Sequence, residues 1–486
     1  MKKIWRVGAY ALLIAFAVLF FCTKSSPGYP INDWADANIY LTIGKGMTQG
    51  DVMYRDLYDH KGPLLYALHW LCALISFSDF TGVFVMEVLL AAAFLMCVYR
   101  LLEIYGAEKA AWVFLPLIML LVYTSVSFAE GDSAEEMCLP LAAGTLAGVL
   151  GYLKNGQKRM RAGQLILHGA LTGCVFWIKF TMIGLHAGLL GWVLLRHLIR
   201  REWKAFWQSL GWLAVGFGLA AVPWVVYFGI NGAIGDWLKV YLYDNLFLYS
   251  GSEALSMAGR VKAMAVCFAE WLLRNPGYTL LTVLGLIWFL LRRKGEWMAV
   301  WLMAGLGAFA TFVGGKSYPY YGLVLAACAP VGLVPLAAWI EKCLSGWKQL
   351  AALTAAACVA LAPLLSHNMH VDYGAPFGSA REDTMQYRVA AVVNETPGAS
   401  LLNYGFMDAG FFTAAGLTPT VKYFHQTNVP LEEMISEQKR YIEDGVCDYV
   451  VTRGRQPESI YLHYELAGEF DTPNLWYEKV LLFRKK

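Results

Sequence analysis

Charged residues are scarce in this chain of 486 residues, because Asp, Glu, Lys and Arg together make up only 15% of it. Hydrophobic residues make up 58%, whereas an average soluble domain carries about 25% charged residues. This leaves too little polar material to cover a soluble protein of this length, which excludes a soluble enzyme and a fibrous protein. The net charge of only +3 also excludes a nucleic-acid-binding protein. The composition indicates a polytopic α-helical membrane protein.

Metal and nucleotide motifs are also lacking. The ten cysteines show no C-x-x-C spacing, and several lie inside apolar stretches, namely Cys97, Cys174, Cys328 and Cys358. Cysteines in such places are typical of small apolar fillers rather than of a disulfide scaffold or a metal site. We find neither a glycine-rich phosphate loop nor an internal repeat. The sequence therefore predicts no metal site and no cofactor.

Long apolar stretches recur between short polar loops up to about residue 370. A helix crosses about 30 Å of hydrocarbon with about 20 residues. We place eleven spans near residues 5–23, 82–99, 110–128, 137–153, 164–180, 181–195, 208–228, 276–291, 297–313, 321–340 and 349–366. Charge becomes more frequent after residue 370. The sequence thus predicts a transmembrane domain over 1–370 and a water-soluble domain over 371–486.

Basic residues predict the orientation of the chain in the membrane. They cluster in alternate short loops, for example within Lys2–Arg6 and Arg292–Lys294, and loops of that kind face the cytoplasm. We therefore expect a cytoplasmic N-terminus, and an odd number of spans places the C-terminal domain outside the cytoplasmic membrane. Because no small-x-small cleavage site follows Met1–Cys22, we expect a retained first span rather than a cleaved signal peptide.

The soluble tail shows mixed α/β patterning. Helices are expected over about 382–394 and 430–443, the second opening with Pro430 and an acidic pair. Strand-like runs are Ala399–Asn403, Lys422–Phe424, Asp448–Thr452, Tyr464–Phe470 and Trp476–Phe483. The tail is therefore predicted to be an extracytoplasmic α/β domain.

Acidic residues gather in two loops on the predicted outer side. The first loop, about residues 23–81, contains Asp33, Asp36, Asp51, Asp56 and Asp59, and the second, about residues 129–136, contains Glu130, Asp132, Glu135 and Glu136. Solvated loops favour charge in general, so this alternative explanation stays open. A loop of nearly sixty residues is nevertheless uncommon without structure or function. Acids beside the bilayer suggest a functional site there.

Asp36 opens a helical stretch in the first loop. Ile39, Ile43 and Met47 share one face of it, which predicts a short amphipathic helix on the membrane surface. Asp36 would lie near its N-terminus, where it could act as a helix cap. A cap can also be a catalytic residue, so the two interpretations are compatible.

Cations near the outer helix ends could bind a phosphate. In the segment Tyr54–Pro63, Lys61 or Arg55 could hold a phosphate, and Asp59 or His60 could orient it. Interfacial snorkelling is the alternative explanation. A second candidate clamp is the segment Gly314–Tyr321, which contains Lys316 and Tyr318, although a solvated loop lysine is equally compatible. Lys179 is a further cation at a helix end.

The order of these motifs resembles the GT-C glycosyltransferases. The motifs are Asp36-x-x-x-Tyr40, the run Asp59-His-Lys-Gly-Pro63, an acidic second loop, and the run Lys316-Ser-Tyr-Pro-Tyr-Tyr321. The nearest relatives look like the dolichyl-phosphate-mannose protein mannosyltransferase-like proteins and the bacterial lipid A aminoarabinose transferases. The resemblance covers about residues 30–150, and 310–325 more loosely. It implies a GT-C-like fold with about eleven transmembrane helices.

The resemblance also implies roles for individual residues. Asp36 matches the base that deprotonates the acceptor, although many relatives have an Asp-Glu pair where this chain has Asp36-Ala37. Lys61 matches a lysine that contacts the donor phosphate, and Lys316 matches a lysine of the aminoarabinose transferases. The catalytic acid of the second loop could be Asp132, Glu135 or Glu136.

The sequence therefore predicts an inverting glycosyltransferase of the cytoplasmic membrane. It would move a sugar from a polyprenyl (undecaprenyl) phosphate to a glycan, lipid or protein acceptor on the outer side. The alternatives are a secondary transporter or flippase, a non-catalytic scaffold with a binding tail, and a related oligosaccharide transferase. Transporters place ionisable groups near the bilayer midplane, and the midplane regions here are almost free of charge.

Overall fold

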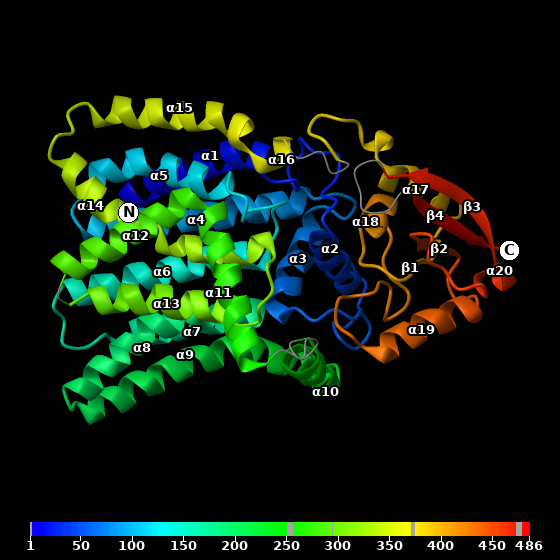
Figure 1. The fold of residues 1–486 in the computed structure, drawn as a ribbon, viewed down its shortest axis with the longest axis horizontal. Helices are drawn as coiled ribbons and strands as arrows, with labels where there is room; N and C mark the ends of the chain where they lie inside the picture. Colours follow the sequence, from blue (N-terminus) through cyan, green and yellow to red (C-terminus); the bar gives the residue numbers. More distant parts are fainter. Residues whose placement is uncertain (1, 250–255, 294, 371–374, 473–478) are drawn as a thin grey trace.

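A computed structural model describes residues 2–249, 256–293, 295–370, 375–472 and 479–486 of the chain. Long helices fill one part of the molecule, and a small sheet with short helices forms the other (Figure 1). The predicted domain boundary at residue 370 borders residues 371–374, which lie outside the described ranges. The division into two domains stays a prediction, and we call residues 375–486 the C-terminal unit.

The first part of the chain is almost entirely helical. Its helices are α1 Lys2–Cys22, α2 Ala35–Thr48, α3 Pro63–Ile75, α4 Thr81–Ile104, α5 Glu108–Tyr123, α6 Ala134–Lys154, α7 Ala162–Lys179, η1 Phe180–Ile183, α8 Gly184–Ile199, α9 Trp203–Ile230, α10 Ile234–Trp237, η2 Leu238–Tyr249, α11 Met257–Arg274, α12 Pro276–Arg292, α13 Trp297–Phe312, η3 Pro319–Cys328, α14 Pro330–Glu341, α15 Trp347–Leu365 and α16 His367–His370. Of these, η1 and η3 are 3₁₀-helices and η2 is a π-helix.

Seven helical runs in the described chain are long and apolar enough to cross a membrane, so the protein is a multi-pass membrane protein. They are Lys2–Cys22, Thr81–Ile104, Ala134–Lys154, Ala162–Ile199, Trp203–Ile230, Pro319–Glu341 and Trp347–His370. The apolar helices α12 and α13 are shorter, with 17 and 16 residues. The run Ala162–Ile199 was expected as two spans, and η1 lies at their joint. The count of eleven spans therefore stays a prediction.

The C-terminal unit contains a four-stranded sheet in the order β1-β2-β4-β3. Its strands are β1 Leu401–Asn403, β2 Tyr449–Thr452, β3 Tyr464–Asp471 and β4 Lys479–Lys485, and its helices are η4 Arg381–Asp383, α17 Met385–Val393, α18 Phe411–Ala415, α19 Glu432–Glu443 and α20 Ile460–His463. The β1–β2 pair is parallel, and β4 runs antiparallel to both β2 and β3.

The α/β prediction for the tail is confirmed, with one correction. The predicted strand at Lys422–Phe424 is wrong, because these residues form turns and bends beside the first loop. The backbone N–H of Tyr58 donates to the Lys422 carbonyl at 3.0 Å, and the N–H of Asn403 in β1 donates to the Phe424 carbonyl at 2.9 Å. This segment therefore lies between the first loop and the edge of the sheet without forming a strand. The first residues of the predicted strand Trp476–Phe483 lie outside the described ranges.

The helix that contains Asp36 has no apolar face open to lipid, so that part of the prediction is wrong. In α2 every residue from Asp36 to Gly46 is buried. Helix α3 packs against one side of α2, and α18 of the C-terminal unit contacts another. The predicted cap is wrong as well, because Trp34 is the N-cap residue and makes no side-chain capping bond. The apolar side chains of α2 therefore pack against protein instead of lipid.

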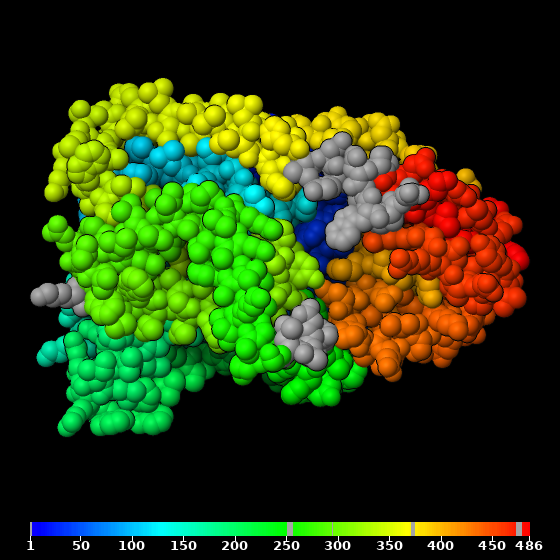
Figure 2. Space-filling view, in the orientation of Figure 1, coloured from blue at the N-terminus to red at the C-terminus, as the bar shows by residue number. Residues whose placement is uncertain are grey.

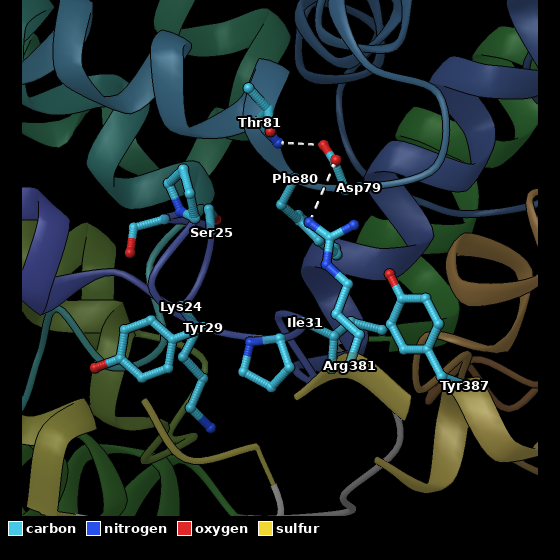
Figure 3. Close-up of a pocket in the computed structure, with 12 residues that line it drawn as sticks. Lys24, Ser25, Tyr29, Ile31, Asp79, Phe80, Thr81, Arg381 and Tyr387 are labelled. Carbon is cyan, nitrogen blue, oxygen red and sulfur yellow. Dashed lines mark hydrogen bonds and ion pairs between the residues drawn. The ribbon is translucent and has the colours of Figure 1, made fainter. Parts of the chain in front are cut away.

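The first loop holds the C-terminal unit on the helices. The Lys45 ammonium group donates to the Phe412 carbonyl at 2.9 Å, and the Thr42 hydroxyl donates to Asp408 at 3.2 Å. At the rim, the Arg381 guanidinium group lies 3.4 Å from the Asp79 carboxylate, which also accepts the backbone N–H of Thr81 (Figure 3). Part of the dark blue N-terminal chain is visible between the green helices and the orange C-terminal unit (Figure 2).

We expect the buried Lys45 to make the stability of the protein depend on pH. Burial lowers the pKa of Lys45 to about 7, although Asp408 opposes this shift. The docked form therefore loses the proton above about pH 7, while a solvated lysine keeps it up to about pH 10.4. Between these values the unfolded chain binds more protons, so stability rises with pH by up to about 1.4 kcal/mol per pH unit.

We expect Lys45→Met to remove the increase of stability with pH. The measurement is thermal unfolding of the detergent-solubilised chain between pH 7 and 9.5, with the parent and Lys45→Met compared at each pH. Thr48→Ala, one turn further along α2, is the control and should follow the parent. Parallel pH profiles for the parent and Lys45→Met would contradict the role of Lys45.

Candidate active site

Asp36 lies at the centre of a cluster of polar side chains from distant segments. Its Oδ2 accepts the hydroxyl of Tyr40 at 3.1 Å and the hydroxyl of Tyr320 at 3.3 Å. The Lys61 ammonium group lies 3.9 Å from the same oxygen. Asp36 is only 6% exposed. One carboxylate thus connects α2, the Asp-His-Lys-Gly-Pro segment and η3.

Tyrosines hold the backbone around Lys61 in place. The hydroxyl of Tyr54 donates to the Lys61 carbonyl at 2.6 Å, and the Lys61 N–H donates to the Tyr66 hydroxyl at 2.9 Å. Tyr66 in turn donates to the Asp59 carboxylate at 2.6 Å. Both tyrosines are fully buried. This loop is therefore a rigid support that presents the Lys61 side chain.

The charges of this loop compensate one another. Burial opposes the ionisation of Asp59, but His60 and Lys61 outweigh burial and hold the pKa of Asp59 below its usual range. Burial likewise opposes a charge on Lys61, and the carboxylates of Asp36 and Asp59 outweigh it, so the pKa of Lys61 is raised. Burial and Lys61 lower the pKa of His60. Lys61 is therefore a cation and His60 a neutral ring at neutral pH.

Gly62 brings Lys61 next to the end of α7. Its N–H donates to the Ile178 carbonyl at 3.1 Å. A Cβ at this position would lie 2.0 Å from the Trp177 carbonyl oxygen, so only glycine permits this approach. The neighbouring residue on α7 is Lys179, whose ammonium group lies 2.5 Å from Glu135.

A cavity of about 320 Å³ opens beside these cations. His60, Lys61, Lys179, Arg260 and Lys316 all line it. Apolar residues at the helix ends complete its wall, among them Ile178, Phe180, Leu246, Ala310 and Val313. The site therefore combines several cations with an apolar side, which suits an anionic group attached to a lipid.

Aromatic rings position two of these cations. Lys316 lies 3.4 Å from the centre of the Tyr249 ring, and Lys179 lies 3.9 Å from the centre of the Tyr321 ring. The two tyrosine hydroxyls are 3.0 Å apart. Cation–π contacts of this kind hold an ammonium group without neutralising its charge. Glu135 is already a carboxylate partner of Lys179, so an anionic ligand would compete with it there.

The three acids of the second loop point in different directions. Glu135 faces Lys179 at the cavity. Asp132 and Glu136 face a buried cluster, in which the Asp132 N–H donates to Glu87 at 2.9 Å and to Glu136 at 3.1 Å. Among the three, Glu135 is therefore the acid in contact with a cavity residue.

Asp132 and His69 share an extra proton. The His69 Nδ1 lies 2.8 Å from the Leu65 carbonyl, to which it must donate, and its Nε2 lies 3.0 Å from both Asp132 oxygens. A neutral ring protonated on Nδ1 has no proton left for a carboxylate. Either His69 carries both protons or Asp132 is protonated, and burial raises the pKa of Asp132.

Arg55 and Tyr318 are predicted ligand-binding residues that do not line the cavity. Arg55 pairs with Asp56 at 2.7 Å and donates to the Asn231 carbonyl at 2.8 Å. The Tyr318 side chain packs against the rings of Tyr320 and Tyr321 and is 39% exposed. The structure thus brings together the remaining cations but not Arg55.

Sequence reasoning missed four residues of this region. Tyr320 contacts Asp36, Tyr249 and Arg260 line the cavity, and His425 lies 3.3 Å from the Tyr58 carbonyl. Tyr320 was within a quoted motif, and its position beside Pro319 could have marked it. Tyr249 and Arg260 lie in 229–275, where no motif drew attention. Among the described residues, no group of three or more His, Cys, Asp or Glu side chains could hold a metal ion.

The architecture is that of the GT-C glycosyltransferases. No family model and no curated protein matches the sequence, but solved structures match the fold. The lipid A aminoarabinose transferase ArnT from Cupriavidus metallidurans, in the apo state, aligns over 99% of this chain and 98% of its own, with 13% identity and a TM-score of 0.57.

Two further structures share this fold. ArnT bound to undecaprenyl phosphate aligns over 99% of this chain and 98% of its own, with 15% identity and a TM-score of 0.53. The mycobacterial arabinofuranosyltransferase AftD aligns over 99% of this chain but 41% of its own, with 15% identity and a TM-score of 0.50. At these identities the likeness establishes the fold, and the site residues rest on the geometry described above.

Substitutions of Asp132 test whether a proton lies between its carboxylate and the His69 ring. Asp132→Asn supplies an amide N–H to a neutral His69, so we expect a thermal stability close to that of the parent. Asp132→Ala leaves the buried His69 nitrogen without a partner, and we expect a loss of about 1–3 kcal/mol. Thermal unfolding of the solubilised protein measures both, and equal losses in the two variants would contradict the assignment.

Proposed function

We propose that the protein is an inverting glycosyltransferase that transfers a sugar from a polyprenyl phosphate to an acceptor hydroxyl. The observation that carries this proposal is the position of Asp36 beside Lys61, because Lys61 lines a cavity together with further cations and apolar helix ends. A candidate base and a candidate phosphate-binding cation therefore lie close together, and a displacement from a sugar phosphate uses both kinds of group.

The donor phosphate would occupy the cationic cavity. Lys61, Lys179 and Lys316 would surround the phosphate, and the apolar wall would receive the start of the polyprenyl chain. ArnT, which has the same fold, was solved with undecaprenyl phosphate bound, and this supports a polyprenyl phosphate donor. The cations would stabilise the negative charge that develops on the departing phosphate.

Asp36 would act as the general base. Both tyrosine hydroxyls and Lys61 approach its Oδ2, and we therefore assign Oδ1 to the acceptor. In the reaction, the acceptor oxygen forms a bond to the anomeric carbon while the bond from that carbon to the phosphate oxygen breaks. The hydroxyl proton passes to Asp36, and polyprenyl phosphate leaves. One displacement inverts the anomeric centre.

Lys61 would have two partners in turn. Without a donor it lies beside Asp36 and offsets the cost of burying that carboxylate. A bound phosphate would compete for the same ammonium group and weaken its hold on Asp36. Donor binding would thus make the base available only when a sugar is present.

The topology follows from the distribution of basic loops. We propose that the protein lies in the cytoplasmic membrane with a cytoplasmic N-terminus. The candidate active site and the C-terminal unit would then face the outer side. The acceptor would be a glycan, a lipid or a protein on that side.

Asp36→Asn should lower the turnover of sugar transfer by about 10²- to 10⁴-fold, because an amide cannot take the acceptor proton. Donor binding should be retained or become tighter, because the Asp36 carboxylate no longer competes with the phosphate for Lys61. Sugar transfer is measured as turnover with a radiolabelled polyprenyl-phosphate sugar, and donor binding is measured as equilibrium binding of the same lipid. Asp56→Asn, in the same loop but paired with Arg55, is the control. Near-normal transfer by Asp36→Asn would overturn the base assignment.

Lys61→Ala should weaken donor binding by about 10- to 100-fold, because a charge-assisted hydrogen bond to phosphate contributes about 1.5–3 kcal/mol. The control is Lys239→Ala, which removes an exposed lysine from η2 outside the cavity lining. Binding of polyprenyl phosphate to protein in nanodiscs is the measurement. An unchanged affinity in Lys61→Ala would remove this lysine from the clamp.

A further inference from the structure

A second cavity lies in the C-terminal unit, at the carboxyl ends of the two parallel strands. It measures about 520 Å³ and is lined by Tyr404, Gly405, Gln426, Ile435, Gln438, Arg453 and Arg455. Tyr404 directly follows β1, and Arg453 directly follows β2. The carboxyl ends of parallel strands are the usual ligand-binding edge of α/β units.

Two tight turns shape this edge. Gly405 and Gly454 follow the two strands with φ angles of +80° and +72°, a conformation that favours glycine. The N–H of Tyr404 donates to the Val451 carbonyl at 3.0 Å, which holds the two turns together. The chain therefore turns away at both strand ends and leaves a hollow between them.

Hydrogen bonds and a cation–π contact fix side chains that line this cavity. The buried side chain of Gln438 on α19 donates to the carbonyls of Asn403 and Tyr423 at 3.1 and 3.0 Å, and it accepts the Gly405 N–H at 3.1 Å. The Arg453 guanidinium group lies 4.3 Å from the centre of the Phe406 ring. These contacts order one arginine and the cavity wall before any ligand binds.

The chemistry of the lining selects an anion. Two guanidinium groups line the cavity, and its described lining contains no acidic side chain. Planar guanidinium groups match phosphate and carboxylate oxygens with paired hydrogen bonds. The amide of Gln426 and the ring and hydroxyl of Tyr404 add partners that suit the hydroxyls and apolar faces of a sugar. A volume of this size is typical of small-ligand sites.

The same segment of chain borders both this cavity and the candidate active site. The Tyr58 N–H donates to the Lys422 carbonyl at 3.0 Å, and His425 lies 3.3 Å from the Tyr58 carbonyl, one residue before Asp59. The next residue, Gln426, lines the cavity, and its N–H donates to the Phe406 carbonyl at 2.9 Å. A ligand held there would lie beside the loop that presents Lys61.

We propose that this cavity binds an anionic sugar unit, bearing a phosphate or a carboxylate, of the acceptor. The role as an acceptor site rests on the proposed transferase function, whereas the binding itself does not. The two arginines would hold the anionic group, and Tyr404 and Gln426 would hold the sugar. The enzyme would then select an acceptor that is already negatively charged.

The test is binding of small probes to the full chain in phosphatidylcholine nanodiscs, measured by calorimetry. Glucose 6-phosphate and glucuronate should bind, and neutral glucose should bind at least about 10-fold more weakly. R453Q/R455Q should lose at least about 10-fold in affinity for glucose 6-phosphate. Arg484→Gln, which removes an exposed arginine of β4 paired with Glu465, is the matched control and should bind as the parent does.

Each contrary outcome overturns a defined part of the proposal. Equal binding of glucose and glucose 6-phosphate, or unchanged binding by R453Q/R455Q, overturns the anion site. Should the double variant unfold, Arg455→Gln alone gives the same test, because Arg455 is exposed. If the probe binds in phosphatidylcholine nanodiscs but not in phosphatidylglycerol nanodiscs, the site is assigned to a lipid headgroup, and the proposal that a sugar unit occupies it is overturned.

The two proposals fail separately. Asp36→Asn should bind glucose 6-phosphate as the parent does, because Asp36 lies outside this cavity. If the parent binds polyprenyl phosphate but no anionic probe, the cavity proposal falls and the transferase proposal stands. If the probe binds through the two arginines but no donor lipid binds, the transferase proposal falls and the proposal of an anion-binding cavity stands.

Discussion

Charges buried beside a membrane are costly unless each has a partner, and the candidate active site is organised around this constraint. Asp36 lies 3.9 Å from Lys61, Glu135 lies 2.5 Å from Lys179, and Asp59 accepts the Tyr66 hydroxyl at 2.6 Å. The partners come from α2, the loop after it, α3, α6 and α7. The Asp36–Lys61 pair therefore joins α2 to the loop after it, and the Glu135–Lys179 pair joins α6 to α7. A ligand phosphate can enter by replacing a protein carboxylate as the partner of a lysine.

Much of the site could be predicted from the sequence because its charges are so few. The sequence marks Lys61 within a charged segment and Lys179 and Lys316 as single cations at helix ends, and the structure brings all three to one cavity. Arg55 looked equivalent to Lys61 in sequence, yet it turns to Asp56. Its orientation depends on the fold of the loop, which no local pattern reveals.

Other features depended on contacts between distant parts of the chain. The lipid-facing side predicted for α2 is covered because α3 packs against one side of the helix and residues 408–412, far along the sequence, contact another. Neighbouring positions in the first turn of α6 point about 100° apart, so Glu135 and Glu136 reach different surroundings. Helix geometry predicts that they differ, but only the packing of α6 shows which of them faces the cavity.

The burial of α2 under the C-terminal unit has a consequence for the synthesis of the protein. The segments that contain Asp36 and Lys61 leave the ribosome early, whereas Asp408 and Phe412, which cover α2, follow more than 340 residues later. During that interval, Thr42 and Lys45 lack the hydrogen bonds that they make to Asp408 and Phe412 in the folded protein. The nascent chain thus inserts its helices with an unfinished site, and the site closes only when nearly the entire polypeptide has been made.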